Sequence, residues 1–350
     1  MRRVSGSVSD QARQARQPNS VVAAGLLPNA EHLERARGLQ RRFPAAHLRQ
    51  VTFVRAPIAS GARIWLALEC MQVTGSFKVR GALLAVEALV AAAPGKTVEL
   101  VAASAGNHGI GVALAARVLG AKATIVVPRG APRTKTDKIA AYGATVITAR
   151  SAGYDDAEAE AMELARTRGV PFLSPYDDLD VLVGNGSSLA FEIVRALGRV
   201  PDVVHCPIGG GGLATGLACG FAHEGTTAAL VWGVQSEASC AFAQSLERGT
   251  AVTSLPPAVT LAEGLEGGIS ERGFARARAM LAGAIVATEE ELAQAMKFAV
   301  RELGLILEGS AAIALAPLLA DADSEGKDRD VVLVLTGRNV DPERLADVVC

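Results

Sequence analysis

The feature that most constrains this chain is a repeated alternation of short apolar runs with Ala- and Leu-rich helical stretches. Most of the runs are apolar throughout rather than alternating with polar residues, which is typical of strands covered on both faces. A repeated β-then-α order predicts parallel sheets with helices on both sides. In such folds ligands bind beyond the carboxyl ends of strands, beside helix N-termini, so the strand-to-helix junctions are the places to search for chemistry.

The apolar runs predict seven strands with helices between them. The predicted strands are residues 63–69, 98–104, 123–128, 144–149, 202–207, 230–235 and 331–337. The predicted helices are roughly residues 107–119, 135–142, 155–168, 186–197, 213–223, 289–303 and 309–320. The first 45 residues are rich in Arg, Gln and Ala, and they predict a mobile tail followed by a helix near 29–42.

Composition excludes several classes of protein. The 350 residues are 50% hydrophobic, enough for one large or two medium domains. A net charge of −1 gives no field that would attract nucleic acid or an anionic membrane. No stretch of about 20 residues is apolar enough to predict a membrane span, and the N-terminus lacks the apolar run of a signal peptide. The five scattered cysteines predict reduced thiols in a cytoplasmic protein.

The first junction of interest is "DVVHCPIGGGGLATGLACGFA", which begins at residue 202. A predicted strand is followed by Gly209, Gly210, Gly211 and Gly212, and a helix is expected near Leu213. Glycines let backbone amides surround an anion, and the helix dipole adds a favourable field. A tight strand-to-helix turn is the alternative, but one turn does not need four successive glycines. The segment therefore predicts a phosphate site, although no Gly-Lys-Ser/Thr of a Walker A loop follows.

The second junction is "VELVAASAGNHGIGVALAARVLG", again a strand, a polar turn and a helix. Ser104, Gly106, Asn107 and His108 offer several donors in sequence, which could hold a carboxylate. The alternatives are that Ser104 and Asn107 only cap the helix, and that His108 is a buried histidine with ordinary partners.

The third junction is "QVTGSFKVRGALLAV", which places Lys78 in the first turn of a helix beginning near Phe77. The positive helix end and the apolar neighbours both disfavour an ammonium, so we expect a lowered pKa. The alternative is a solvated lysine at a helix end. A neutral amine beside a phosphate site is what Schiff-base chemistry requires, and pyridoxal 5'-phosphate has both an aldehyde and a phosphate.

Taken together, these segments resemble the serine/threonine dehydratase family of pyridoxal-phosphate enzymes over roughly residues 48 to 345. The matching segments are "RAPIAS", "LECMQVTGSFKVRGA", "SAGNHGIGVA", "KIAAYGATV", "SPYDDLDVLVGNG", "PIGGGGLATG", "LAEGLEGG", "LEGSAAIALA" and "LTGRNVD". The resemblance implies an α/β fold with two open twisted parallel-rich sheets flanked by helices, similar to tryptophan synthase β (fold type II). It also implies a large domain of residues 46–81 and 179–350, and a small mobile domain of residues 82–178 after an N-terminal tail and helix (1–45).

The resemblance also assigns roles to individual residues. Lys78 would bind the cofactor aldehyde and act as the acid/base at the substrate α-carbon. The residues expected to contact the cofactor are Phe77 against the ring, Asn107 at the ring hydroxyl, Gly209, Gly210, Gly211, Gly212 and Leu213 at the phosphate, Glu308 near the ring at a helix start, and Thr336 at the pyridine nitrogen. The residues expected to hold the substrate carboxylate are Ser104, Gly106, Asn107 and His108.

The expected reaction is β-elimination from L-threonine or L-serine to a 2-oxo acid and ammonia. The hydroxyl of Thr336 need not protonate the ring nitrogen, so the ring is a weaker electron sink and prompt loss of the β-substituent is favoured. Alternatives are β- or γ-replacement, as in threonine synthase or a diaminopropionate-forming synthase, and dehydration of a specialised substrate such as 3-hydroxyaspartate. A binding protein that has lost the chemistry is a further alternative, which the intact Lys78 and glycine loop argue against.

Several positions depart from the family pattern. Ala105 stands where racemases place a second serine, so racemisation is disfavoured. Gln235 and Ala241 stand where some members have acidic cation ligands, so no metal site is expected, with Glu237 as a possible surrogate. Arg338 replaces a glycine, and it either faces solvent or a dimer partner, or binds a distal carboxylate of the substrate.

Three further expectations follow from the resemblance. The segment "GNGSSLAFEI" (184–193) is one residue longer than usual, which could reshape the edge of the cleft. The chain ends soon after "TGRNVD", so a regulatory domain is not expected and a catabolic or specialised enzyme is favoured. The expected partners are a small amino-acid substrate and a second copy of the chain, as homodimers are common in the family, with no nucleic acid or membrane.

Overall fold

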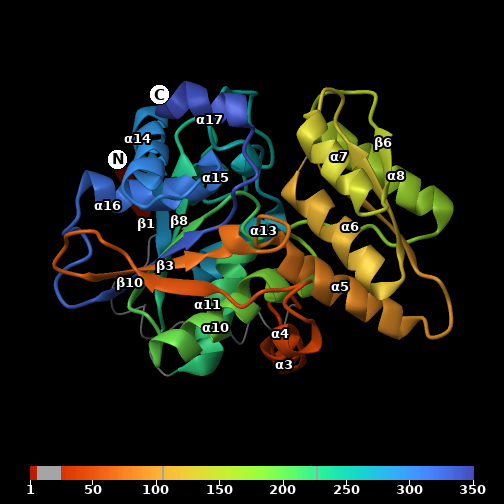
Figure 1. The fold of residues 1–350 in the computed structure, drawn as a ribbon, viewed down its shortest axis with the longest axis horizontal. Coiled ribbons are helices and arrows are strands. Elements are labelled where there is room, and N and C mark those ends of the chain that lie inside the picture. Colours follow the sequence, from red (N-terminus) through yellow and green to blue (C-terminus); the bar gives the residue numbers. More distant parts are fainter. Residues whose placement is uncertain (6–24, 105, 226–227) are drawn as a thin grey trace.

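Two sheets lie side by side in the computed structural model, which describes residues 1–5, 25–104, 106–225 and 228–350. The larger sheet has the strand order β1-β9-β8-β7-β10-β3-β2, and the smaller sheet has the order β4-β5-β6. Helices flank both, and the small sheet with its helices forms the right-hand part of Figure 1. The predicted α/β class with two parallel-rich sheets is therefore confirmed.

The larger sheet is parallel except at its two edges. Its strands are β1 (Arg2–Ser5), β2 (Thr52–Arg55), β3 (Arg63–Leu68), β7 (Val203–Pro207), β8 (Leu230–Ser236), β9 (Gly283–Ala287) and β10 (Asp330–Leu335). The edge strands β1 and β2 pair antiparallel with β9 and β3. Strands β1, β2 and β9 were not predicted, and β1 contradicts the expectation of a mobile tail from the first residue. The rest of that predicted tail, residues 6–24, lies outside the described residues.

The small sheet consists of three parallel strands, all predicted. They are β4 (Glu99–Ala103), β5 (Lys122–Val127) and β6 (Thr145–Thr148), and their helices are α6 (Asn107–Leu119), α7 (Arg133–Ala141) and α8 (Tyr154–Arg168). These helices are the predicted ones to within two residues, because each apolar stripe ends close to a glycine or proline that interrupts the helix.

The remaining helices pack mainly around the larger sheet. They are α3 (Ala30–Arg37), α4 (Leu39–Arg42), α5 (Lys78–Ala92), α9 (Leu179–Leu182), α10 (Ser188–Leu197), α11 (Gly212–Glu224), α12 (Ala241–Arg248), α13 (Glu271–Met280), α14 (Glu289–Arg301), α15 (Gly309–Ala312), α16 (Ala316–Ala320) and α17 (Pro342–Val349). The predicted helix at 29–42 is broken at Gly38, and the one at 309–320 contains a 3-10 turn at Ile313–Leu315.

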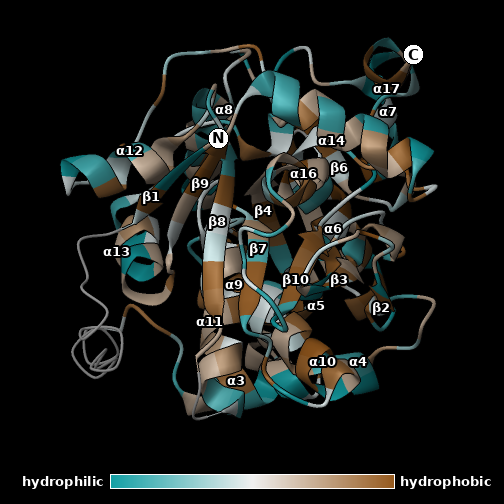
Figure 2. Ribbon diagram, turned by 90° about the vertical axis from the view of Figure 1, so that its left-hand side faces the viewer, coloured by the Kyte–Doolittle hydropathy of each residue, from teal (hydrophilic) through white to brown (hydrophobic). Residues whose placement is uncertain are grey.

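The uniformly apolar strands form the core, as their composition predicts. Every residue of β7 and β10 is buried, and Figure 2 shows these hydrophobic strands enclosed by helices. Each buried Val, Leu or Ile side chain contributes about 1.5–3 kcal/mol relative to its exposed state. Within the described part of the chain, no helix has the length and apolar character needed to cross a membrane.

The segment expected to be one residue longer than usual begins in a π-helical turn at Val183–Ser187, which leads directly into α10. A π turn holds one more residue than an α turn, so it absorbs an insertion without ending the helix. This turn packs against α11, since a Cβ added to Gly186 would lie 2.4 Å from the Leu213 carbonyl oxygen. Residues 184–193 do not line the cavity described below, so the expected change at the cleft edge is wrong.

Candidate active site

A cavity of about 1160 Å³ opens where the carboxyl ends of strands from both sheets meet. Its walls include residues that follow β4, β5, β7 and β10, as expected for a parallel α/β fold. The structure brings every predicted site residue to this cavity: Phe77, Lys78, Ser104, Gly106, Asn107, His108, Gly209, Gly210, Gly211, Gly212, Leu213, Glu308 and Thr336. Their individual roles remain predictions.

The glycine loop connects β7 to α11 and has two physical reasons to be glycine. Gly211 has φ of +86°, a left-handed conformation that L side chains rarely adopt. A Cβ added to Gly210 would lie 2.7 Å from Cγ of Tyr176, so the tyrosine ring lies directly on the loop. The first turn of α11 has backbone N–H groups without helical acceptors, which is how helix N-termini bind phosphate.

The loop between β4 and α6 is held by Ser104. Its Oγ accepts a hydrogen bond from the Gly106 amide at 3.0 Å. The N-cap residue of α6 is Gly106, and no side chain caps the helix. The alternative in which Ser104 and Asn107 serve only as side-chain caps is therefore wrong. Ala105, the position that bears on racemisation, lies outside the described residues.

His108 is a neutral histidine with one unused acceptor. Its Nε2 lies 3.1 Å from the Leu173 carbonyl oxygen, and because a carbonyl only accepts, Nε2 carries the hydrogen. Burial, with the nearby Lys78 charge, lowers the pKa of His108 to about 3. Its buried Nδ1 has no partner among the described groups. The ring thus has no hydrogen left for a carboxylate, and such a contact could come only from the His108 backbone amide.

Lys78 begins α5 and faces the cavity. Its Nζ donates to the Pro175 carbonyl at 3.2 Å, and it forms no ion pair with the described residues. Burial lowers the pKa of the amine to about 8, while the Glu308 charge acts in the opposite direction. The amine also lies 5.2 Å from the centroid of the Phe77 ring. The lowered pKa expected from the sequence is therefore present, with burial as its main cause.

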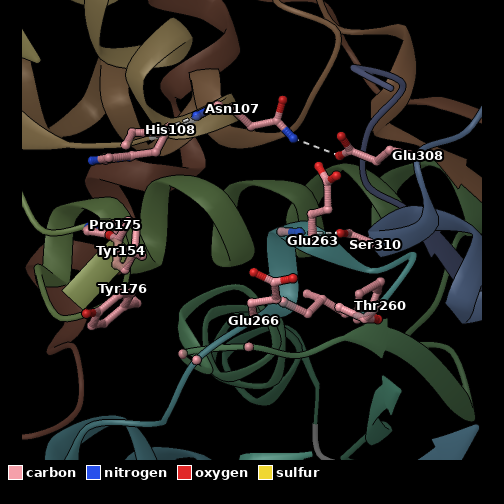
Figure 3. A pocket seen from close by; sticks show the side chains of 18 of the residues that line it. Asn107, His108, Tyr154, Pro175, Tyr176, Thr260, Glu263, Glu266, Glu308 and Ser310 are labelled. Atoms are coloured by element: carbon pink, nitrogen blue, oxygen red, sulfur yellow. Dashed lines mark hydrogen bonds between the residues drawn. The ribbon is translucent and has the colours of Figure 1, made fainter. Parts of the chain in front are cut away.

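Two polar groups lie where β10 and α15 approach the cavity. Thr336 follows β10 and is 4% exposed, with Oγ1 3.5 Å from the Ser310 carbonyl oxygen. Glu308 is the N-cap residue of α15, the predicted helix start. Its Oε1 accepts a hydrogen bond from Asn107 Nδ2 at 2.7 Å (Figure 3). Burial raises the pKa of Glu308, and nearby lysines and Asn107 offset part of that effect.

The wall on the side of the small sheet carries residues that sequence reasoning missed. Tyr176 Oη donates to both carboxylate oxygens of Glu158, at 2.9 and 2.7 Å. Burial raises the pKa of Glu158. Tyr154 lies beside this pair in the same wall (Figure 3). Tyr176 lies in the matching segment "SPYDDLDVLVGNG" but was given no role, and Glu158 has ordinary helical spacing and meets Tyr176 only through the fold.

Acidic side chains outnumber basic ones around the cavity. Of the described residues that line it, eight are Asp or Glu and four are Lys or Arg. Two of the four cations, Lys135 and Arg344, pair with the same carboxylate, Glu263. The lining of the cavity therefore carries an excess of acidic side chains.

Comparison with known proteins agrees with this geometry. Residues 45–337 match the family described as pyridoxal-phosphate dependent enzyme. This chain is a member of that family. L-Threonine ammonia-lyase of Thermotoga maritima is 35% identical over 295 residues, covering 83% of this chain and 70% of the relative. L-Threonine dehydratase catabolic TdcB of Staphylococcus aureus is 35% identical over 289 residues, covering 82% of each.

A solved structure gives the same result for the fold. The processed form of threonine deaminase isoform 2 from Solanum lycopersicum matches with a TM-score of 0.78 and 28% sequence identity, covering 92% of this chain and 88% of that one. The residues of this pyridoxal-phosphate enzyme fit its cofactor. A buried amine of low pKa and a glycine-rich helix start share one cavity, and His108 adds a buried Nδ1 that has no partner among the described groups.

The departures from the family pattern can also be located. Arg338 does not line the cavity, and its Nη1 lies 3.4 Å from the Met71 sulfur. The interpretation in which Arg338 binds a substrate carboxylate therefore has no support here. Both ends of the Gln235 amide have partners, since Nε2 donates to the Ile208 carbonyl and Oε1 accepts from the Ala243 amide. Over the described residues, no group of three His, Cys, Asp or Glu could hold a metal.

Proposed function

We propose that this pyridoxal-phosphate enzyme eliminates water from a short β-hydroxy amino acid, L-threonine or L-serine, and releases a 2-oxo acid and ammonia. The observation that carries the proposal is one cavity that combines the low-pKa amine of Lys78, a glycine-rich helix start and the hydroxyl of Thr336. The printed names of the 35%-identical relatives, a threonine ammonia-lyase and a threonine dehydratase, support it.

The residues divide the work as follows. When bound, the cofactor supplies an aldehyde for Lys78 and an electron-withdrawing ring that stabilises negative charge at the α-carbon. Backbone amides of Gly209 to Leu213 would hold its phosphate. The amine of Lys78, with a pKa of about 8, is poised near neutral pH to take the α-proton of the substrate. Thr336 can hydrogen-bond an uncharged ring nitrogen, which favours loss of the β-hydroxyl over a long-lived carbanion.

The atoms balance over the whole reaction. Elimination breaks the Cα–H and Cβ–O bonds and releases water, and the enamine product becomes an imine by proton transfer. Hydrolysis of that imine takes up one water and releases ammonia. Threonine then gives 2-oxobutyrate and serine gives pyruvate, with no external oxidant or reductant.

The charge around the cavity favours a neutral side chain on the substrate. Figure 3 shows Glu263 and Glu266 reaching into the cavity from one side, with Tyr176 on the other. A second carboxylate, as in 3-hydroxyaspartate, would enter a cavity lined by more acidic than basic side chains, and Lys135 is already paired with Glu263. We therefore place 3-hydroxyaspartate below threonine and serine as a substrate.

The deciding experiment incubates the pure, cofactor-loaded protein with L-threonine, L-serine and L-threo-3-hydroxyaspartate, and measures 2-oxo acid and ammonia. We expect release from threonine or serine and at least tenfold lower kcat/KM for 3-hydroxyaspartate. Preference for 3-hydroxyaspartate would refute the substrate assignment. A normal cofactor spectrum without release from any of the three would refute the elimination and favour β-replacement.

We also propose that the protein is a cytoplasmic homodimer. The described cysteines are all free thiols, which suits a reducing compartment, and the family resemblance supports the dimer. Light scattering on the purified protein would test the assembly, with a mass of one chain, 36.0 kDa, as the contradicting result.

A further inference from the structure

The Asn107 side chain can bind a ligand through either end of its amide, and the two ends have opposite polarity. Only Nδ2 can donate to an oxygen such as the ring hydroxyl of the cofactor. The Glu308 contact does not by itself choose between the ends. Burial raises the pKa of Glu308, and a protonated carboxyl can donate as well as accept.

Asn339 resolves this choice because its own amide has one possible orientation. Asn339 is 6% exposed and follows β10. Its Nδ2 donates to the Thr74 carbonyl at 2.8 Å, a group that only accepts. Its Oδ1 accepts from the Lys138 ammonium at 3.1 Å, a group that only donates. With both ends held by groups of fixed polarity, the Asn339 amide cannot be reversed without losing both hydrogen bonds.

The orientation of the Asn339 amide in turn fixes that of the Asn107 amide. Asn339 Nδ2 also donates to Asn107 Oδ1 at 2.7 Å, so Asn107 Nδ2 must lie on the other side, where it bonds Glu308 at 2.7 Å. Nδ2 carries two hydrogens, and one remains available to a ligand. We infer that Asn339 is a positioning residue, which turns the Asn107 amide so that an N–H points to the ring hydroxyl of the cofactor. The inference rests on the cofactor site of the proposed function.

The turn before Lys78 is shaped to admit Asn339. Gly75 has φ of +80°, and a Cβ added there would lie 2.6 Å from Asn339 Oδ1. The backbone oxygen of Gly75 also accepts from the Arg338 amide at 2.9 Å. The glycine of "TGSFK" is thus required by the side chain that positions Asn107, as well as by the turn.

The first test compares Asn339→Ala with the wild type in two measurements that do not depend on turnover. These are the dissociation constant of pyridoxal phosphate and the pH midpoint of the visible band of the bound cofactor. We expect the dissociation constant to rise about 3- to 10-fold, as for loss of one hydrogen bond, and the pH midpoint to shift. Unchanged values for both would overturn the inference.

The second test asks whether Asn339 acts through Asn107. In an Asn107→Ala background, Asn339→Ala should change the cofactor affinity by less than twofold. It should not shift the pH midpoint measurably. The two substitutions would then be strongly non-additive, as expected for residues in one network. An equal effect of Asn339→Ala in both backgrounds would mean a general structural role and would refute the positioning role.

A surface variant keeps the inference testable if Asn339→Ala does not fold. Lys138 is exposed on α7, and Lys138→Glu replaces a group that only donates with one that accepts. We expect it to weaken cofactor binding about two- to threefold and to shift the pH midpoint in the same direction as Asn339→Ala. The Lys138 charge also lowers the pKa of Glu308, so Lys138→Met and Lys138→Gln are compared as well. Both remove the charge, but only glutamine can still donate to Asn339, so Lys138→Gln should bind the cofactor more tightly than Lys138→Met. Arg133→Glu, a charge reversal elsewhere on the same helix, should change neither value.

Equal effects of Lys138→Met and Lys138→Gln, or of Lys138→Glu and Arg133→Glu, would assign the change to charge and refute the role of Asn339. These outcomes are separate from the proposed function. A protein that binds the cofactor with the expected couplings but turns over neither threonine nor serine would refute the reaction and leave the positioning role intact.

Discussion

Lys78 and Arg80 lie two residues apart at the start of α5, yet the protein treats the two cations in opposite ways. Lys78 lines the cavity and has one hydrogen bond, to the Pro175 carbonyl. Arg80 is 0% exposed and is held by two carboxylates, Glu69 and Glu192, at 2.7–3.1 Å. Burial disfavours both charges, and it lowers the pKa of Lys78 to about 8. At Arg80, attraction to Glu192 and Glu69 outweighs the effect of burial and raises the pKa of the guanidinium above its usual value.

Two residues within one turn of α5 thus have separate roles, one in the chemistry at the cavity and one in the stability of the fold. Residues two apart on an α-helix point about 200° apart, so Lys78 faces the cavity while Arg80 faces the protein interior. A buried cation with paired carboxylates stays charged and joins elements together. A buried amine with only a carbonyl for a partner gives up its proton easily, which is the property of a nucleophile or base.

The largest expected effect is on activity. Lys78→Ala removes both the cofactor attachment point and the base, so kcat should fall by about a thousandfold or more. The visible band of the bound cofactor should disappear, while the far-ultraviolet circular dichroism stays that of the wild type. A Lys78→Ala protein that kept a tenth of the wild-type kcat would contradict the assignment of Lys78.

At Arg80, two residues later, we expect substitution to lower the stability of the fold. Arg80→Met leaves Glu69 and Glu192 buried without their cation, which should lower the free energy of unfolding by about 3–5 kcal/mol. Urea denaturation of the cofactor-free protein measures this change. The matched control is Arg166→Met, which removes an exposed pair with Glu163 on α8 and should leave the free energy of unfolding almost unchanged. Similar losses in the two variants would show that the Arg80 cluster is not structural.

The pKa of Lys78 also predicts how stability changes with pH. The amine changes from a pKa of 10.5 when unfolded to about 8 when folded, so the folded state disfavours the ammonium. Below pH 8 this lowers the free energy of unfolding by about 3 kcal/mol, and the penalty disappears as the pH rises toward 10.5. Cofactor-free wild type should therefore gain stability relative to Lys78→Met between pH 8 and 10.5. A difference in the free energy of unfolding that stays constant over this pH range would contradict the lowered pKa of Lys78.

The smallest expected effect comes from the Glu308 carboxylate, whose charge raises the pKa of Lys78. Glu308→Gln should therefore move the midpoint for cofactor attachment, followed as rate against pH, below about pH 8. Glu271→Gln removes a charge from the cavity rim that does not act on Lys78, so its midpoint should stay near that of the wild type. A midpoint that rises in Glu308→Gln would reverse the sign of this coupling.

The sequence allowed the parts of the site that are local in the chain to be predicted. Lys78 and Gly209 to Gly212 stand out because a strand, a turn and a helix start lie within a few residues of one another. Tyr176 and Glu158 could not be found in this way, since Glu158 on α8 meets Tyr176 only in the folded chain, where the tyrosine lies on the glycine loop. Asn339 was likewise missed, because its partners come from three separate segments.

The same distinction applies to the fold. Strands β7 and β10 were predicted because their sequences are strongly apolar. In the structure every residue of both strands is buried. Strand β9, "GAIVA", contains too few β-branched residues to stand out, and it is fixed by its neighbour β8. The π turn at Val183–Ser187 was not predicted, because it depends on close packing between glycines of this turn and of α11.

The most direct test of this account is to find where the cofactor attaches. Three lysines lie in or beside the cavity, Lys78, Lys135 and Lys138. Borohydride reduction of the loaded protein, followed by peptide mass mapping, identifies the amine that carries it. The account predicts a reduced pyridoxyl phosphate group on Lys78 and on neither of the others. A reduced cofactor group on Lys135 or Lys138, or a reduced cofactor that leaves the protein without a covalent bond to it, would contradict this prediction.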